Sequence, residues 1–279
     1  MQLDEARRES FEAWEAMAQG WERARERIEA SAAPVREWLV RELAPQPGDT
    51  VLELAAGPGE TGFEIARLVG AEGRVVSSDR SPAMVDVARR RAEELGLGNV
   101  ELRVLDSEDL DLPDASVDGV VCRFGYMLMH DPARALRETR RVLRHGGRLV
   151  CAAWRAGERN PWVSVAGRMF VARGHVPPPE PGAPGMFTLA SDERIGELLA
   201  AAGFTRVRIE DIPVLFVAES LAAYIADARE TGGLFARVWE AVSESERESM
   251  TAELAEAFAR FEVDGRYELP GLAVGVAAD

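Results

Sequence analysis

The stretch Val51-Leu-Glu-Leu-Ala-Ala-Gly-Pro-Gly-Glu-Thr-Gly62 contains the features that decide the fold. It combines a short apolar strand that holds one acid, Glu53, with a glycine turn and the beginning of a helix. Gly57, Gly59 and Gly62 fit the G-x-G-x-x-G spacing, which lets backbone approach a ligand at a helix N-terminus. The stretch therefore predicts a strand, a turn and a helix that open a nucleotide-binding unit.

Two more acids follow at similar intervals along the chain. Asp79 and Asp106 each stand at the end of another apolar run. A nucleotide-like cofactor that lies across the ends of three neighbouring parallel strands requires such a layout. The spacing therefore indicates a cofactor before it indicates a substrate.

Strand-like and helical patterns alternate along most of the chain. Ser81-Pro82 and Asp131-Pro132 each join an N-cap residue to a proline at the first helical position. The expected strands are 51–54, 74–77, 100–105, 117–122, 149–153, 207–217 and 272–276. The expected helices are 61–69, 81–96, 131–145, 191–203 and 220–261, after a first helical segment at 1–44. Such alternation predicts an α/β fold with a parallel sheet covered on both faces.

We divide the chain into four parts from these patterns. They are an N-terminal helical cap (1–44), a core (45–155), a lid insertion (156–190) and a C-terminal part of the core (191–279) with a helical insertion at about 220–262. The lid insertion contains the run Val176-Pro-Pro-Pro-Glu-Pro181. The helical insertion either enlarges the lid or builds the interface of a homodimer.

Composition limits the class of protein. The chain has 279 residues, a formal net charge of −15 and only two cysteines, Cys122 and Cys151. The acidity argues against a broad nucleic-acid surface, and two cysteines are too few for a disulfide framework. The three histidines are scattered, so we expect no metal site. With neither a leader nor a long apolar run in view, we expect a cytoplasmic protein without membrane or nucleic-acid partners.

The acids near the glycine turn separate two classes of cofactor. Glu53 interrupts a strand that is normally wholly apolar in dinucleotide-binding proteins, and Glu60 and Glu64 would disfavour a phosphate at the helix start. A cofactor with a cationic centre and an ammonium group tolerates all three. In either class Asp79 can accept both hydroxyls of a ribose, and Asp106 can accept from an adenine amino group.

Several ordered motifs together resemble the class I S-adenosylmethionine-dependent methyltransferases, within them the small-molecule branch of ubiquinone and menaquinone biosynthesis. The motifs are Val51–Gly59, Ser78–Met84, Leu105–Glu108, Leu112–Asp118 and Asp131–Leu149. The resemblance is strong over about residues 45–155 and loose elsewhere. It implies a Rossmann-like, doubly wound sheet of seven mostly parallel strands whose last strand is antiparallel, with a helical lid from the N-terminus and the insertions.

The resemblance also implies a set of cofactor-binding residues. Glu53 and the backbone of Ala55, Ala56, Gly57 and Gly59 would hold the methionine part. Asp79 would bind the ribose, Arg80 and Met84 would lie beside the adenine, and Asp106, Ser107 and Glu108 would frame its edge. Arg123 and Phe124, just past the fourth strand, would close the methionine side through backbone groups. The chain departs from the family pattern in having Glu at position 53 and Arg144-His145-Gly146-Gly147 where Lys/Arg-Pro-Gly-Gly is commoner.

The sequence says less about the methyl acceptor than about the cofactor. Proximity and orientation supply much of the rate of methyl transfer, and a general base helps only when the acceptor must lose a proton. The candidate bases are His130 and His175, which also fit ordinary loop positions. The candidate substrate-binding residues are Trp14, Trp21, Tyr126, Met129, Trp162 and Phe187, which predict a small, partly apolar acceptor or are ordinary packing.

Three functions are compatible with these patterns. The first is a methyltransferase that acts on O, C or N of a small molecule and releases S-adenosylhomocysteine. The second is an NAD(P)-dependent oxidoreductase that uses the glycine turn. The third is a non-catalytic protein that binds S-adenosylmethionine or S-adenosylhomocysteine. Glu53 and Asp106 favour the first over the second.

Overall fold

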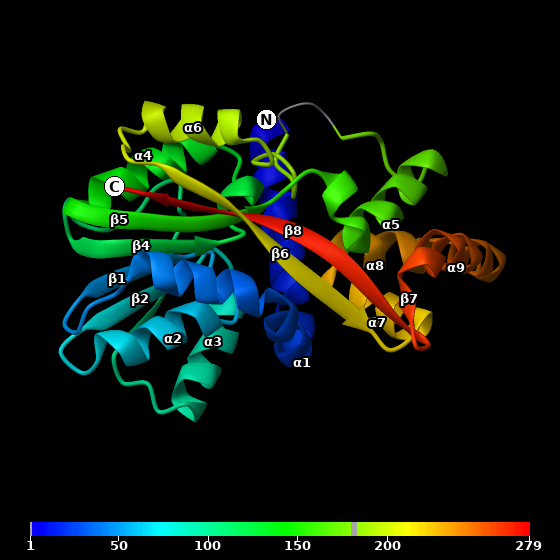
Figure 1. Cartoon of the computed structure of the whole chain (residues 1–279), viewed down its shortest axis with the longest axis horizontal. Helices are drawn as coiled ribbons and strands as arrows, with labels where there is room; N and C mark the ends of the chain where they lie inside the picture. Colours follow the sequence, from blue (N-terminus) through cyan, green and yellow to red (C-terminus); the bar gives the residue numbers. More distant parts are fainter. Residues whose placement is uncertain (1, 180–182) are drawn as a thin grey trace.

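The computed structural model describes residues 2–179 and 183–279 (Figure 1). A single mixed sheet runs through the molecule, and a helical layer surrounds the far end of the strand pair Arg208–Ala218 and Arg266–Ala278. Within the described ranges, every helix is too short or too polar to cross a bilayer. Glu180 and Pro181, which end the predicted proline-rich run of the lid insertion, lie outside the described residues.

The sheet has the order β3-β2-β1-β4-β5-β8-β6. Its strands are β1 Thr50–Leu54, β2 Arg74–Asp79, β3 Val100–Val104, β4 Val117–Arg123, β5 Leu143–Trp154, β6 Arg208–Ala218, β7 Glu262–Val263 and β8 Arg266–Ala278. Strands β1 to β5 pair in parallel, whereas β8 runs antiparallel to both β5 and β6. The predicted seven-stranded sheet with an antiparallel last strand is therefore confirmed, with the two-residue strand β7 added beside β8.

The helices fill the connections between strands. They are α1 Gln2–Leu43, α2 Glu60–Val69, α3 Pro82–Glu94, α4 Pro132–Val142, α5 Pro161–Ala172, α6 Asp192–Ala201, α7 Leu221–Thr231, α8 Gly233–Ala241 and α9 Glu244–Phe258, with short 3-10 turns η1 Tyr126–Leu128, η2 Gly157–Arg159 and η3 Ala259–Phe261. Ser81 and Asp131 cap α3 and α4 by accepting from backbone N–H groups, as their Ser-Pro and Asp-Pro pairs predict.

Two strands begin more than two residues away from the sequence prediction, whereas the other expected strands agree to within two. β5 begins at Leu143, six residues earlier than expected, because Leu143 pairs with Val117 ahead of a register shift in β4. This pairing also ends α4 at Val142 rather than at His145. β8 is more than twice as long as the expected strand at 272–276, because its first half pairs with β6 beyond the end of β5.

The long helix α1 has two separate packing surfaces. Its C-terminal part buries Val35, Trp38, Leu39 and Leu43 in the main core beneath the sheet. Its N-terminal part instead packs Trp14, Ala18 and Trp21 against Met84 and Val87 of α3. The apolar spacing that predicts this helix therefore belongs to a segment that reaches past the core to the side of α3.

The two insertions of the sequence pack together around a second core. We call this core the lid cluster: Ala166, Met169, Phe170, Ala218, Tyr224, Phe235, Val238, Trp239, Met250, Leu254, Phe258 and Leu269. These residues come from α5, α7, α8, α9 and the extended ends of β6 and β8. The lid insertion and the helical insertion, which residues 191–219 separate in sequence, thus form one layer at the far end of the β6–β8 ribbon (Figure 1).

We expect Val238→Ala to lower the free energy of unfolding by about 2 kcal/mol, because it removes two buried methyl groups from the lid cluster. Val238 is 4% exposed. Leu234→Ala in the same helix is the control, since Leu234 is 43% exposed, and it should lower stability by less than half as much. Urea unfolding of both variants measures the difference. Equal losses would mean that α8 is not anchored by this cluster.

Candidate functional site

Three acids lie at one edge of the sheet. Glu53 is the fourth residue of β1, Asp79 is the last residue of β2, and Asp106 follows β3 by two positions. Because β3, β2 and β1 are parallel neighbours, their carboxyl ends meet at the same edge. The structure thus brings together the three acids that the sequence spacing singled out, at the position where open α/β sheets bind ligands.

Glu53 is a buried carboxyl group, 3% exposed. Its Oε1 accepts from the Gly62 N–H at 2.9 Å and its Oε2 from the Ser77 hydroxyl at 2.6 Å. Burial raises the pKa of Glu53 to about 7, although these hydrogen bonds and the charge of Arg123 act in the opposite direction. A cation bound beside this group would restore its negative charge at neutral pH.

The glycine turn needs its glycines for two different reasons. Gly57 and Gly59 have φ of 54° and 88°, in the left-handed region that favours glycine. Gly62 is required for space, because a Cβ there would lie 2.2 Å from Oε2 of Glu53. Ala55 also has a positive φ, 50°, which places a strained non-glycine residue at the carboxyl end of β1.

Gly62→Ala is therefore expected to displace the Glu53 carboxylate and to weaken binding of S-adenosylhomocysteine by about tenfold, the loss of roughly one charge-assisted hydrogen bond. Gly196→Ala in α6 is the control, since a Cβ there meets nothing within 4 Å. Isothermal titration calorimetry measures both affinities. An unchanged affinity in Gly62→Ala would show that the exact position of Glu53 does not matter for binding.

Asp79 connects the glycine turn to the start of α3. Its Oδ2 accepts from the Gly57 N–H and its Oδ1 from the Ser81 N–H, both at 2.9 Å. Burial raises the pKa of Asp79, and the backbone hydrogen bonds from Ser81 and Gly57 oppose this shift. Each oxygen keeps a further lone pair, so the carboxylate can accept two hydroxyl groups as well.

The segment after β3 contains two acids, Asp106 and Glu108, that differ in how many hydrogen bonds and ion pairs they make within the protein. Asp106 accepts from the Glu108 N–H at 2.9 Å, and its other oxygen lies 4.0 Å from Nε of Arg80. Glu108 is 5% exposed and accepts from the N–H groups of His130 and Asp131, at 2.8 and 3.1 Å. Glu108 therefore holds backbone in place, and Asp106, whose side chain is 39% exposed, is the one of the two predicted adenine-edge acids that remains accessible.

The N-terminal part of α1 covers these groups. Arg7 pairs with Glu108, the Phe11 ring lies 5.8 Å from the Arg80 guanidinium, and Glu15 accepts from the Ala83 N–H at 3.0 Å. Sequence reasoning missed Arg7 and Glu15, because charged residues on the polar side of an amphipathic helix carry no spacing signal of their own. The predicted adenine neighbour Met84 lies directly under this part of the helix.

Arg123 belongs to a buried ion-pair network at the end of β4. Its two terminal nitrogens contact the Glu29 carboxylate of α1 at 2.5 and 3.1 Å. Burial alone would raise the pKa of Glu29, but Arg123 and Arg36 hold it below its usual value. The charge of Arg123 is thus neutralised within the protein rather than presented to a ligand. The next residue, Phe124, has a φ of 63°, a strained left-handed conformation at a strand end.

Four aromatic rings form a continuous wall from the end of β4 toward the lid cluster. We call Phe124, Trp154, Trp162 and Phe216 the aromatic wall. Phe124 stacks on Trp154 with ring centroids 4.2 Å apart, Trp154 meets Trp162 edge-on at 5.2 Å, and Trp162 stacks on Phe216 at 4.0 Å. Trp162 and Phe124 were predicted site residues, whereas Trp154 and Phe216 were missed because they read as ordinary strand residues.

The other predicted substrate-binding residues lie elsewhere. Tyr126 is buried and its hydroxyl pairs with Thr139, so it belongs to the core rather than to an acceptor wall. Trp14 and Trp21 pack on α3 against Met84 and Val87 and take no part in the aromatic wall. Met129 and Phe187 pack against the main core as partly buried residues. Of the six predicted residues, only Trp162 is in the wall.

Neither predicted catalytic histidine contacts the aromatic wall through a hydrogen bond or ion pair. His130 faces Glu108, Arg7, Arg80 and Asp106, and burial is the main cause of its lowered pKa. His175 follows the C-terminus of α5, the opposite end from Trp162, and its Nε2 lies 2.9 Å from Glu246 of α9. The structure therefore places His130 beside Glu108 and Asp106, and His175 in a hydrogen bond with Glu246 of α9.

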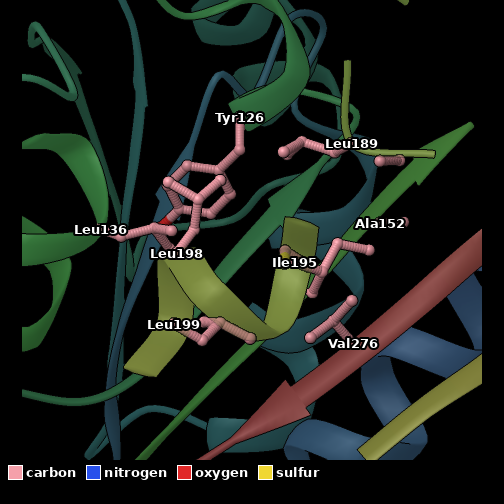
Figure 2. Close-up of a pocket in the computed structure, with 10 residues that line it drawn as sticks. Tyr126, Leu136, Ala152, Leu189, Ile195, Leu198, Leu199 and Val276 are labelled. Atoms are coloured by element: carbon pink, nitrogen blue, oxygen red, sulfur yellow. The ribbon is translucent and has the colours of Figure 1, made fainter. Parts of the chain in front are cut away.

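Two hollows lie away from these acids. A cavity of about 20 Å³, the size of one water, is lined by apolar side chains of α4, α6, β5 and β8, with Leu198 and Tyr126 facing it (Figure 2). It is an apolar packing defect, too small for a substrate. A surface hollow of about 410 Å³ lies at the amino end of β3.

Across residues 2–179 and 183–279, no group of three or more potential ligands has metal-binding geometry.

Comparisons with known proteins agree with this geometry. A family model described as a methyltransferase domain matches residues 45–171. A ubiquinone/menaquinone biosynthesis C-methyltransferase of Hahella chejuensis is 42% identical over 101 residues, which cover 36% of this chain and 40% of that protein. The matched segment thus spans well under half of that relative.

Solved structures extend the likeness of fold over most of the chain. A SAM-dependent methyltransferase from Aquifex aeolicus is 24% identical, with a TM-score of 0.50 over 65% of this chain and 87% of that one. A geranyl diphosphate C-methyltransferase from Streptomyces coelicolor, solved with Mg²⁺, geranyl diphosphate and S-adenosyl-L-homocysteine, is 18% identical, with a TM-score of 0.53 over 88% and 78%. The fold, the sequence motifs and the family model all indicate a methyltransferase domain.

Proposed function

We propose that this chain, which carries a class I S-adenosylmethionine-dependent methyltransferase domain, binds S-adenosylmethionine and transfers its methyl group to a small, partly apolar acceptor. The observation that carries the proposal is the row of Glu53, Asp79 and Asp106 on three neighbouring parallel strands. Each acid has an acceptor suited to one part of this cofactor: the ammonium, the ribose hydroxyls and the adenine amino group.

The residues present fit the cofactor. Glu53 offers a buried carboxyl group whose raised pKa a neighbouring cation would lower, and Asp79 retains unused lone pairs on both oxygens. The left-handed turn at Gly57 and Gly59 keeps side chains out of the way of the methionine part. When bound, the cofactor supplies an electrophilic methyl group on sulfur. The protein then has to orient the acceptor and exclude water.

The aromatic wall supports an apolar acceptor. It begins at Phe124, at the end of β4, which pairs directly with β1. Arg123, which precedes Phe124 in the chain, is already paired with Glu29, so this end of the wall offers ring surface rather than a free cation. Such a surface favours a neutral acceptor with an apolar or aromatic portion and disfavours a phosphorylated one. The acceptor atom that receives the methyl group is O, C or N.

Calorimetric titration of S-adenosylhomocysteine, with NADH and NADPH titrated in parallel, tests the cofactor. We expect micromolar binding of S-adenosylhomocysteine and no binding of either dinucleotide. Preference for a dinucleotide would overturn the proposal. Turnover of S-adenosylmethionine with a panel of small aromatic acceptors then separates an enzyme from a protein that only binds the cofactor.

A further inference from the structure

One face of α1 makes a series of polar and aromatic contacts along the nucleoside side of the site. Arg7 reaches Glu108 after β3, Phe11 covers Arg80 after β2, and Glu15 accepts from Ala83 at the start of α3. These contacts follow the helix at intervals of four residues, so they lie on one side of it. The helix therefore crosses the ends of β3 and β2 from one acid-bearing loop to the next.

We propose that Arg7 is a positioning residue: through its ion pair with Glu108 it closes the N-terminal part of α1 over the purine end of bound cofactor and sets how slowly the cofactor leaves. This inference rests on the proposed function, since it names the residue that retains the same cofactor. Arg7 acts through Glu108 and is not a catalytic residue.

The contact between α1 and the loops after β3 and β4 buries two side-chain nitrogens without satisfying them. Nε of Arg7 and Nε2 of His130 are both buried and have no hydrogen-bond partner among the described residues. A buried polar group without a partner destabilises the arrangement that buries it. The Arg7–Glu108 ion pair is the contact that holds the first turns of α1 against the loop after β3, so its loss should ease opening at this end.

The anchoring of α1 makes such a movement local. Its C-terminal part is fixed in the main core by Trp38 and Leu39. Its middle is fixed to the lid, where Trp21 donates to the Thr231 carbonyl at 3.0 Å and Gly20 packs on the backbone of Glu230. The segment before Trp21 has neither of these two anchors, so its opening need not unfold the core.

Arg7→Gln should raise the dissociation rate of S-adenosylhomocysteine by about tenfold, as expected when one partner of a partly buried ion pair is removed. Arg8→Gln is the matched control. Arg8 is 65% exposed and lies 3.9 Å from Glu5 and Glu12, so its loss should leave the rate unchanged. Arg7→Lys, which keeps the charge, should restore part of the slow dissociation. Stopped-flow measurement on the full chain gives the three rates.

Hydrogen exchange provides a readout that does not depend on turnover. In wild type, the amides of residues 5–19 should gain protection when S-adenosylhomocysteine is added, and this gain should be reduced in Arg7→Gln but not in Arg8→Gln. Equal dissociation rates in wild type and Arg7→Gln, with tight binding in both, would overturn the role of Arg7 and leave the proposed function standing. Failure of wild type to bind S-adenosylhomocysteine would instead overturn the proposed function.

Discussion

Asp79→Ala is expected to weaken the binding of S-adenosylhomocysteine by about 100-fold, the loss of two hydrogen bonds to a charged acceptor. The carboxylate of Asp79 would accept both ribose hydroxyls and, in the protein itself, fixes the Gly57 and Ser81 amides at 2.9 Å. Its removal thus loses ligand contacts and loosens the turn that carries the methionine part. Glu53, on β1, and Asp106, after β3, lie on either side of Asp79 and are proposed to meet other parts of the cofactor.

Calorimetry on three variants separates the two effects. Asp79→Asn keeps the shape and one good acceptor, so its affinity should fall between those of wild type and Asp79→Ala. Asp111→Ala removes an acid that is 95% exposed and should bind as wild type does. If Asp79→Ala keeps its circular dichroism spectrum and binds within threefold of wild type, the ribose role of Asp79 is wrong.

Much of this fold follows from local signals in the sequence. The strands β1 to β4 are short apolar runs bounded by turn residues, and the cap-plus-proline pairs at Ser81 and Asp131 begin α3 and α4 as predicted. Right-handed crossovers between parallel strands then put the carboxyl ends of these strands at one edge of the sheet. The three acids could be placed at one edge for the same reason, since each immediately ends or interrupts a predicted strand.

The acceptor side could not be predicted in the same way, because it is built from long-range contacts. Phe124 and Phe216 are 92 positions apart, and only the extension of β6 and β8 beyond β5 brings their rings to the same wall. Tyr126 illustrates the opposite error. Its place after β4 suggested an acceptor wall, but a hydrogen bond to Thr139 holds it in the core. Exposure of a side chain is a property of the assembled layers, which residue type alone does not reveal.

Glu53 is expected to make the stability of the protein fall as the pH rises from about 4.5 to about 7. Burial raises the pKa of Glu53 to about 7 from its ordinary value of 4.5, so in this range the folded chain keeps a proton that the unfolded chain has released. The state that binds more protons, here the folded state, is favoured at low pH. Raising the pH therefore favours unfolding. A shift of this size corresponds to about 3 kcal/mol.

Urea unfolding at pH 4.5, 6 and 7.5 measures this contribution. Glu53→Gln cannot ionise but can still accept from Gly62 and donate to Ser77, so it should lack the loss of about 3 kcal/mol that wild type shows over this range. Glu101→Gln, at a half-exposed position of β3, should behave as wild type. Parallel pH profiles for wild type and Glu53→Gln would show that Glu53 is already ionised at pH 5.

The same ionisation links stability to cofactor binding. The ammonium group of S-adenosylhomocysteine should favour ionised Glu53, so its affinity should rise with pH up to about 7 and then level off. 5′-Methylthioadenosine has the same nucleoside but no ammonium group, so its affinity should be much less sensitive to pH. In Glu53→Gln the two ligands should show the same pH dependence. A rise for both ligands in wild type would assign the titration to another group and remove Glu53 from recognition of the ammonium.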